Sequence, residues 1–533
     1  MRNHILIKKG GNYIMYLSRI KDYVKKNYLL VLLFVIAAII ETALVFPLMY
    51  WDSINYDSAY QYALTHHTIS EIWELLPYDY SPPFYAIALK LYTMIFGSSL
   101  IVMRTFSIIA VVGMLFISVF PINSLFGRNT ALWSLFITFT SSYIFNMIHE
   151  VRPTIFAMFF FMGASVYAAA AYAHEKKHEY VCMTVFSVLA MYTHNVALVG
   201  AFGMYVVLLA FALISKNYKK FKHFLISGII CAVLYLPWLS VILKQITSVN
   251  DHFWTADVEA VETLNWILLG NFSQSLFKVS VPMLLGLLLF FALLKHIKIK
   301  ELKTAAHFKD IFKPCAEKEE YRNILLMIMI IAAPCIILAV VNAFLRNLAS
   351  YRYYGILAVA WIAPLSAMLA RFGNKVCCTL LALCIVISNT YDIYDLTDEL
   401  RTSNIFDIVS DMEQIESDDE IVFLHLHEWS VGTMAYYFPN AKHYVCDRTF
   451  TVLKTYDVFP VEVVDIGDWQ NIWNYADKVY IYIPVMDDLT EDNEDIFSEA
   501  EFITNYALAY RVSRKQCELY ELTKDRKSLD DMN

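Results

Sequence analysis

Residues 28–60 decide the fold and read YLLVLLFVIAAIIETALVFPLMYWDSINYDSAY. A long apolar run, Tyr28 to Trp51, leads directly into a polar and aromatic stretch. The run is long enough to cross about 30 Å of hydrocarbon as an α-helix. Seven Lys and Arg lie in the first 27 residues, and the run is longer than the apolar core of a cleavable signal peptide. We therefore expect an uncleaved first membrane span.

The composition of the whole chain is typical of a membrane protein. Of its 533 residues, 58% are hydrophobic and 17% are charged, and the mean hydropathy is +0.48. Soluble domains are less apolar and about one-quarter charged. No Lys- or Arg-rich tract has the form of a nucleic-acid-binding arm, so we expect no nucleic-acid partner. The nine cysteines have no CxxC or CxxH spacing and predict no zinc or redox motif.

Ten further apolar runs predict about eleven spans in total. They lie at about 100–120, 130–148, 153–173, 180–195, 196–214, 223–243, 279–294, 323–345, 353–370 and 375–391. Two spans within 180–214 require a tight turn near His194–Asn195, and the orientation of every later loop depends on that turn.

The charge of the loops predicts the orientation of the chain in the cell membrane. Under this count the long basic loops fall on one side, whereas the loop 52–99 has five acids and a single lysine, Lys90. Loops rich in Lys and Arg stay in the cytoplasm. We expect a cytoplasmic N-terminus (1–27) and an extracytoplasmic loop 52–99.

The composition changes after Tyr391. Residues 392–533 are rich in acids and polar groups, with strand-like runs at 420–426, 478–484 and 517–522 and a helical segment at 430–437. Strands that alternate with helices indicate a small α/β domain. The predicted fold is a polytopic α-helical membrane domain over 28–391 with a soluble extracytoplasmic α/β domain over 392–533.

The first outside loop is the predicted place of the chemistry. Residues 54–76 fit amphipathic helices on the membrane surface, and Pro82-Pro83 redirects the chain into an interfacial or re-entrant segment, 84–97. An aspartate at a membrane surface can act as a general base, because partial desolvation brings a carboxyl pKa towards neutrality. Asp52, Asp57 and Asp79 all fit this description, and each also fits a solvated acid or a helix cap.

Arginines at the outer ends of spans are the second candidate feature. Arg152 begins a span two residues after Glu150, and Arg352 begins another. Charged side chains at such depths are costly and usually face a protein cavity. The alternative is that they reach lipid phosphates at the interface.

Seven short motifs occur in an order that resembles one superfamily. They are Tyr56-Asp57-Ser58, Ser81-Pro82-Pro83-Phe84-Tyr85, Arg104, Glu150-Val151-Arg152-Pro153-Thr154, Tyr192-Thr193-His194-Asn195, Tyr235-Leu236-Pro237-Trp238 and Arg352-Tyr353. This order resembles the polytopic glycosyltransferases of the GT-C superfamily, in the branch of protein O-mannosyltransferases, lipid A aminoarabinose transferases and bacterial mannosyltransferase-like proteins. The chain departs from the pattern at Ser58, Ser81 and Thr154, where relatives have an acid, His or Lys, and Tyr.

The resemblance implies transfer of a sugar from a polyprenyl-phosphate carrier to a glycan, lipid or protein acceptor at the outer face of the membrane. Asp57 would be the general base, and inversion at the anomeric carbon would follow from a single displacement. Arg152, Arg352 and Arg104 would stabilise the departing phosphate. Further substrate-site candidates are Glu150, Asp52, Asp79, Tyr85 and His194.

Two other functions remain open on the residues alone. One is a transporter or flippase of a lipid-linked saccharide, and the other is a catalytically inactive scaffold of the cell envelope. Polar residues gathered at outer span ends favour the enzyme, because transporters usually place them near the bilayer midplane. Ser58 in place of an acid leaves both a divalent metal and the scaffold open.

Overall fold

The structure is a computed structural model in which eight helices are long and apolar enough to cross a membrane. It describes residues 21–51, 54–79, 81–252, 319–344, 351–373, 375–401, 421–446, 453–464, 469–476, 478–484, 496, 500–510 and 513–522. Within these ranges the eight span candidates are α2 (Tyr28–Trp51), α6 (Leu100–Phe126), α9 (Thr154–His174), α11 (Asn195–Ile214), α12 (Tyr218–His252), α18 (Glu319–Phe344), the continuous stretch Arg352–Arg371 and α21 (Lys375–Arg401). The stretch Arg352–Arg371 comprises α19 (Tyr351–Ala358), η2 (Val359–Trp361) and α20 (Ile362–Phe372).

A ninth candidate is a bent pair. α7 (Arg128–Thr140) and α8 (Ser142–Ile148) meet at an angle of 52° at Ser141. α10 (Lys177–Thr193) has 17 residues and lies below the length of the eight. The predicted span 279–294 lies outside the described residues. The described spans confirm the multi-pass helical fold. α21 continues to Arg401, past the expected end of the membrane domain at residue 391.

The predicted break at His194 is present. α10 ends at Thr193, α11 begins at Asn195, and the two helices pack against each other. His194 adopts an extended backbone conformation, and its Nδ1 accepts a hydrogen bond of 3.1 Å from the amide of Val196. The side chain caps α11 because the first amides of a helix have no partner within the helix.

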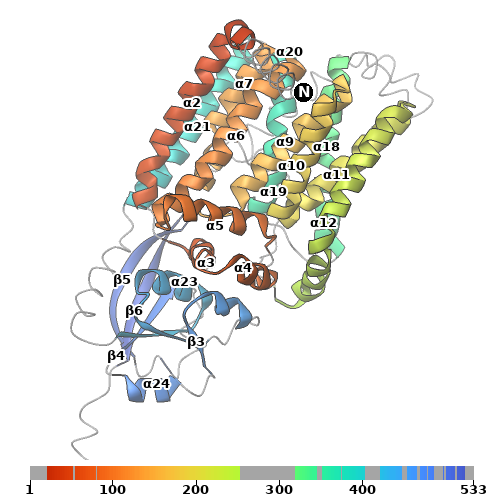
Figure 1. Cartoon of the computed structure of the whole chain (residues 1–533). Helices are drawn as coiled ribbons and strands as arrows, with labels where there is room; N and C mark the ends of the chain where they lie inside the picture. The colour runs from red at the N-terminus through yellow and green to blue at the C-terminus, as the bar shows by residue number, and fades with distance from the viewer. Residues whose placement is uncertain are drawn as a thin grey trace, which may run out of the picture.

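The first loop folds into short helices at one end of the bundle. They are α3 (Tyr56–Leu64), α4 (Ile69–Leu75), η1 (Leu76–Tyr78) and α5 (Phe84–Phe96). Asn55 caps α3 by accepting from the amide of Ser58 at 2.8 Å, and Thr68 forms a capping box with Glu71 at the start of α4. Figure 1 shows these helices between the bundle and the sheet.

The C-terminal residues form a six-stranded sheet in the order β3-β2-β1-β4-β6-β5. The strands are β1 (Ile421–His425), β2 (Lys442–Val445), β3 (Glu462–Val463), β4 (Lys478–Pro484), β5 (Ala500–Tyr510) and β6 (Ser513–Leu522). The first four are parallel, and β6 and β5 are antiparallel to their neighbours. The remaining elements are α23 (Glu428–Tyr437), η3 (Leu453–Val458) and α24 (Trp469–Tyr475). The predicted α/β fold, its three strand-like runs and the helix near 430–437 are confirmed.

The C-terminal domain docks on the first loop through α23 and η3. α23 packs on α3, and the Thr433 hydroxyl donates to the carbonyl of Ile54 at 3.3 Å. A Cβ at Gly432 would lie 3.0 Å from the ring of Tyr56, so glycine permits this close approach. The ring of Phe459 packs on Tyr56 and Tyr60. The first loop and the C-terminal domain therefore share one end of the bundle.

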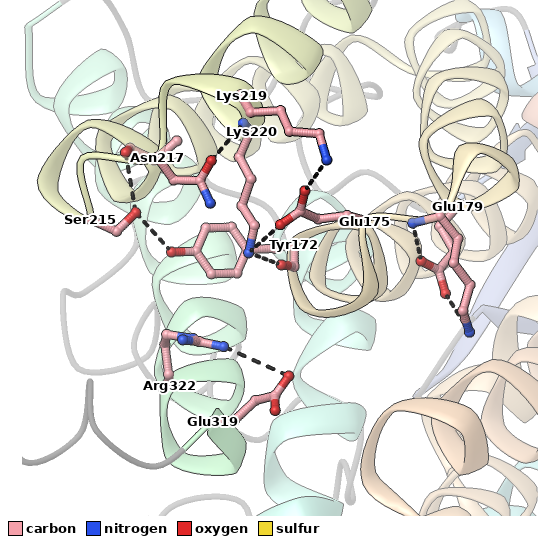
Figure 2. A network of polar contacts seen from close by, with 11 residues as sticks. Tyr172, Glu175, Glu179, Ser215, Asn217, Lys219, Lys220, Glu319 and Arg322 are labelled. Carbon is pink, nitrogen blue, oxygen red and sulfur yellow. Dashed lines mark hydrogen bonds and ion pairs between the residues drawn. The ribbon is translucent and has the colours of Figure 1, made fainter.

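A polar network holds the helix ends at the opposite end of the bundle (Figure 2). Lys220 donates to the carbonyl of Tyr172 at 2.5 Å, lies over the ring of the same residue and pairs with Glu175 at 3.5 Å. Arg322 of α18 pairs with Glu319 at 3.8 Å. Basic residues thus gather at the end away from the acidic first loop, as the charge pattern of the loops predicts.

A hydrogen-bonded histidine pair lies in the core of the C-terminal domain. His425 Nε2 is 2.9 Å from His443 Nδ1, His425 Nδ1 is 2.8 Å from the Ser430 hydroxyl, and His443 Nε2 is 2.8 Å from the carbonyl of Phe438. The carbonyl can only accept, so in the neutral pair each Nε2 carries the hydrogen. Burial lowers the pKa of His425 well below 6.5, with the neighbouring His443 adding to the shift, and burial also lowers the pKa of His443.

Acid is expected to destabilise the C-terminal domain. The neutral rings contribute their full stability above the unfolded pKa of about 6.5, and the unfolded chain gains protons first as pH falls below it. Between pH 6.5 and pH 5 we therefore expect the free energy of unfolding of the domain to fall as the pH falls. Hydrogen exchange in β1 and β2 of the full protein measures this loss. His443→Gln should reduce the pH slope, whereas His66→Gln, at an exposed histidine, should leave it unchanged.

Candidate active site

Four of the predicted site residues meet at the loop end of the bundle. Asp57 lies in the first turn of α3, Arg152 in the turn before α9, and Arg352 in the first turn of α19. Arg152 Nη2 pairs with Asp57 Oδ2, and Arg352 Nη1 lies 3.6 Å from the same oxygen. Arg152 Nε also lies 3.5 Å from Glu150 Oε2. Residues from three distant parts of the chain thus form one cluster of two cations and two anions.

The backbone around the cluster is held by hydroxyl groups from neighbouring helices. The Ser58 hydroxyl accepts from the amide of Val151 at 3.3 Å, which ties α3 to the turn that carries Arg152. The Ser107 hydroxyl of α6 donates to the carbonyl of Glu150 at 3.1 Å. The Tyr143 hydroxyl of α8 donates to the carbonyl of Arg352 at 3.3 Å. Ser58, one of the three departures from the superfamily pattern, therefore has a hydrogen-bond partner of its own.

The two carboxylates of the cluster differ in their access to solvent. The Glu150 side chain is 3% exposed, and the Asp57 side chain is 41% exposed. The Arg152 and Arg352 side chains are largely buried, at 12% and 8%. Buried guanidinium groups need paired anions, because an unpaired buried charge costs several kcal/mol. Asp57 is thus the member of the cluster that an incoming substrate can reach.

Tyr85 is a buried site candidate whose pKa is affected by the charge of Glu150. It is in the first turn of α5 and is almost fully buried. Burial raises the pKa of Tyr85, and the negative charge of Glu150 raises it further. Its hydroxyl makes no hydrogen bond to the part of the chain that the structure describes. The phenol is therefore held in its neutral form, with its hydroxyl group in the core of the protein.

Other predicted site residues have different neighbours in the structure. Arg104 is buried, and its Nη1 donates to the carbonyl of Met49 at the end of α2 at 2.7 Å, so its role as a phosphate ligand stays a prediction. The ring of His194 is 5.4 Å from that of Tyr353, which follows Arg352. Asp79 follows η1, and burial raises its pKa to about 7. Asp52 lies outside the described residues.

Sequence reasoning missed the hydroxyl groups of Ser107 and Tyr143. Both lie within apolar helices, and no spacing in the sequence indicates that they face the site. Only the packing of α6 and α8 brings them there. Within the described residues, no group of three or more His, Cys, Asp or Glu could hold a metal ion.

A glycine next to the site allows the close approach of Tyr143. A Cβ at Gly355 would lie 1.9 Å from the Tyr143 hydroxyl oxygen, which supports Arg352. We expect Gly355→Ala to destabilise the protein by about 1–3 kcal/mol, the usual cost of overpacking. Thermal unfolding in detergent measures the effect. Gly228→Ala is the matched control, because its Cβ would make an ordinary contact of 3.5 Å with Tyr205. Equal melting temperatures of the two variants would contradict the prediction.

The fold and the cluster define a class of protein: a multi-pass membrane protein with a carboxylate and two arginines at one end of its helices, next to a soluble domain. A family model described as dolichyl-phosphate-mannose-protein mannosyltransferase matches residues 80–241. This range runs from α5 to α12 and includes Glu150 and Arg152.

Solved structures of ArnT from Cupriavidus metallidurans share the fold. The structure bound to undecaprenyl phosphate has a TM-score of 0.58 at 11% identity, over 93% of this chain and 98% of that one. The apo structure has a TM-score of 0.50 at 12% identity, over 92% and 98%. No curated protein matches the chain in sequence. The chain thus has the GT-C fold that its motifs predict, and the matches support a membrane glycosyltransferase of the GT-C superfamily.

Proposed function

We propose that the protein transfers a sugar from a polyprenyl-phosphate donor to an acceptor at the outer face of the membrane. The observation that carries the proposal is the contact of one accessible carboxylate, Asp57, with two buried arginines at the loop end of a GT-C fold. Guanidinium groups bind phosphate in the same paired geometry as carboxylate. The description of the matching family model names a dolichyl-phosphate sugar, and the similar ArnT structure holds undecaprenyl phosphate.

In the proposed reaction Asp57 is the general base. An acceptor hydroxyl loses its proton to the carboxylate while its oxygen attacks the anomeric carbon of the sugar. The bond between that carbon and the phosphate oxygen breaks, and the electron pair leaves with the phosphate. Arg152 and Arg352 stabilise the charge that develops on the leaving phosphate. A single displacement of this kind inverts the anomeric configuration.

The outer-face location of the site is part of the proposal. The first loop and the C-terminal domain lie together at one end of the bundle, whereas Lys219, Lys220 and Arg322 lie at the other. Basic loops remain in the cytoplasm. The site and the domain that covers the loop would then face the extracytoplasmic space, and the domain is a candidate surface for acceptor recognition.

The test is sugar transfer by the purified full-length protein. A radiolabelled polyprenyl-phosphate hexose is incubated with cell-envelope acceptor fractions, and label is followed from lipid to acceptor. Transfer by the wild type supports the enzyme. If several donor sugars give no labelled acceptor but labelled lipid crosses the bilayer of proteoliposomes, the protein is a transporter. If neither occurs, the inactive scaffold is favoured.

A further inference from the structure

The base and the phosphate ligands of the proposed site contact one another in the absence of donor. A single carboxylate oxygen, Asp57 Oδ2, contacts both Arg152 and Arg352. A carboxylate between two guanidinium groups is a poor proton acceptor, because taking up a proton would weaken both ion pairs. The structure therefore holds Asp57 in a state that opposes its proposed role.

The same contacts mark the place of an anion. Arginine binds carboxylate and phosphate oxygens through the same planar set of N–H donors. Asp57 Oδ2 thus occupies the position between two guanidinium groups that a phosphate oxygen of the donor would take. Asp57 Oδ2 and a phosphate oxygen cannot occupy this position at the same time.

The charge balance of the cluster decides which group gives way. Arg152 and Arg352 carry two positive charges, and Asp57 and Glu150 carry two negative ones. A phosphate that enters the cluster adds negative charge and needs the N–H groups that Asp57 Oδ2 contacts, so a carboxylate must give up those groups. Glu150 is buried at 3% exposure, whereas Asp57 is 41% exposed in the first turn of α3. Asp57 can move into solvent, whereas moving Glu150 would require repacking of the helices around it.

We infer that Asp57 and the donor phosphate compete for Arg152 and Arg352, so that binding of the donor releases Asp57 to act as the base. This inference rests on the proposed function. It makes proton acceptance conditional on the presence of donor, because only the phosphate removes the two arginines from the carboxylate. Glu150 stays with Arg152 and keeps its guanidinium in place.

The consequence is an unusual expectation for the variant that lacks the base. Asp57→Asn should bind polyprenyl phosphate more tightly than the wild type by about 10- to 100-fold, the size of a charge-assisted hydrogen bond. Binding of undecaprenyl phosphate to the purified full-length protein in detergent measures this change. The uncharged alcohol of the same chain length should bind both proteins equally, because it has no phosphate to compete.

The controls separate competition from a general change in charge. Glu74→Gln removes an exposed acid from the same loop and should leave the affinity for the phosphate unchanged. Asp57→Ser serves as a second variant if the amide disturbs the fold, which a melting curve reports. Equal or weaker binding by the Asp57 variants, with clear binding by the wild type, would overturn the inference alone. Absence of phosphate-dependent binding in the wild type and all variants would overturn the proposed function as well.

Discussion

Asp57→Asn is expected to lower the rate of sugar transfer about 10²- to 10⁴-fold, the usual contribution of a general base. The amide keeps the size of the side chain but cannot take the proton of the acceptor hydroxyl. Because Asp57 is the accessible member of the cluster, the loss should appear in the rate at saturating donor. Initial rates of label transfer, at several donor concentrations, measure it.

The rate and the donor affinity should change in opposite directions in this variant. Slow transfer together with tight binding of polyprenyl phosphate separates loss of the base from loss of the fold. Glu74→Gln is the matched acid-to-amide control on the same loop, and it should transfer at the wild-type rate. If Asp57→Asn transferred sugar at the wild-type rate, Asp57 would not be the general base.

Arg152→Ala and Arg352→Ala are each expected to lower transfer by about 10²- to 10³-fold, as loss of one group that stabilises developing charge does in other enzymes. Both guanidinium groups would contact the leaving phosphate, so we expect donor binding to weaken as well. Kinetics with donor in excess separate the loss in rate from the loss in binding. Because the two residues act on one phosphate, the double variant should lose less than the product of the single effects.

The arginine variants also leave a carboxylate with fewer partners. Removing one member of a buried ion pair can cost 3–5 kcal/mol, so each variant requires a melting curve. Lysine variants keep the charge but lose the paired geometry, and we expect intermediate rates. Arg128→Ala is the control, because Arg128 is exposed at the start of α7, at the end of the bundle away from the site. A folded Arg152→Ala protein with wild-type kinetics would contradict the phosphate role.

The C-terminal domain contacts the helix that carries Asp57. α23 packs on α3, the helix that carries Asp57, and Thr433 donates to the carbonyl of Ile54 just before the Asn55 cap. A change in the position of α23 would therefore move the helix that holds the proposed base.

Most elements of the fold could be predicted from the sequence because they have a local signal. Apolar runs of spanning length predict helices from hydrophobic burial alone, and the runs at 420–426 and 478–484 became β1 and β4. The break at His194 was predicted from the parity of the loops and was found between α10 and α11. β5 was not predicted, because its pairing with β6 depends on contacts between strands rather than on a local pattern.

The order of the motifs in the sequence indicated Asp57, Glu150, Arg152 and Arg352 as candidate site residues. The resemblance alone could not predict which of these side chains contact one another. Only the tertiary structure decided that both arginines contact the same oxygen of Asp57. It also decided that Arg104 faces the carbonyl of Met49 and that Ser58 bonds to the amide of Val151. The physical reason is that apolar composition specifies which segments cross the membrane, whereas ion pairs depend on how those segments pack. That packing brings α3, the turn before α9 and α19 together.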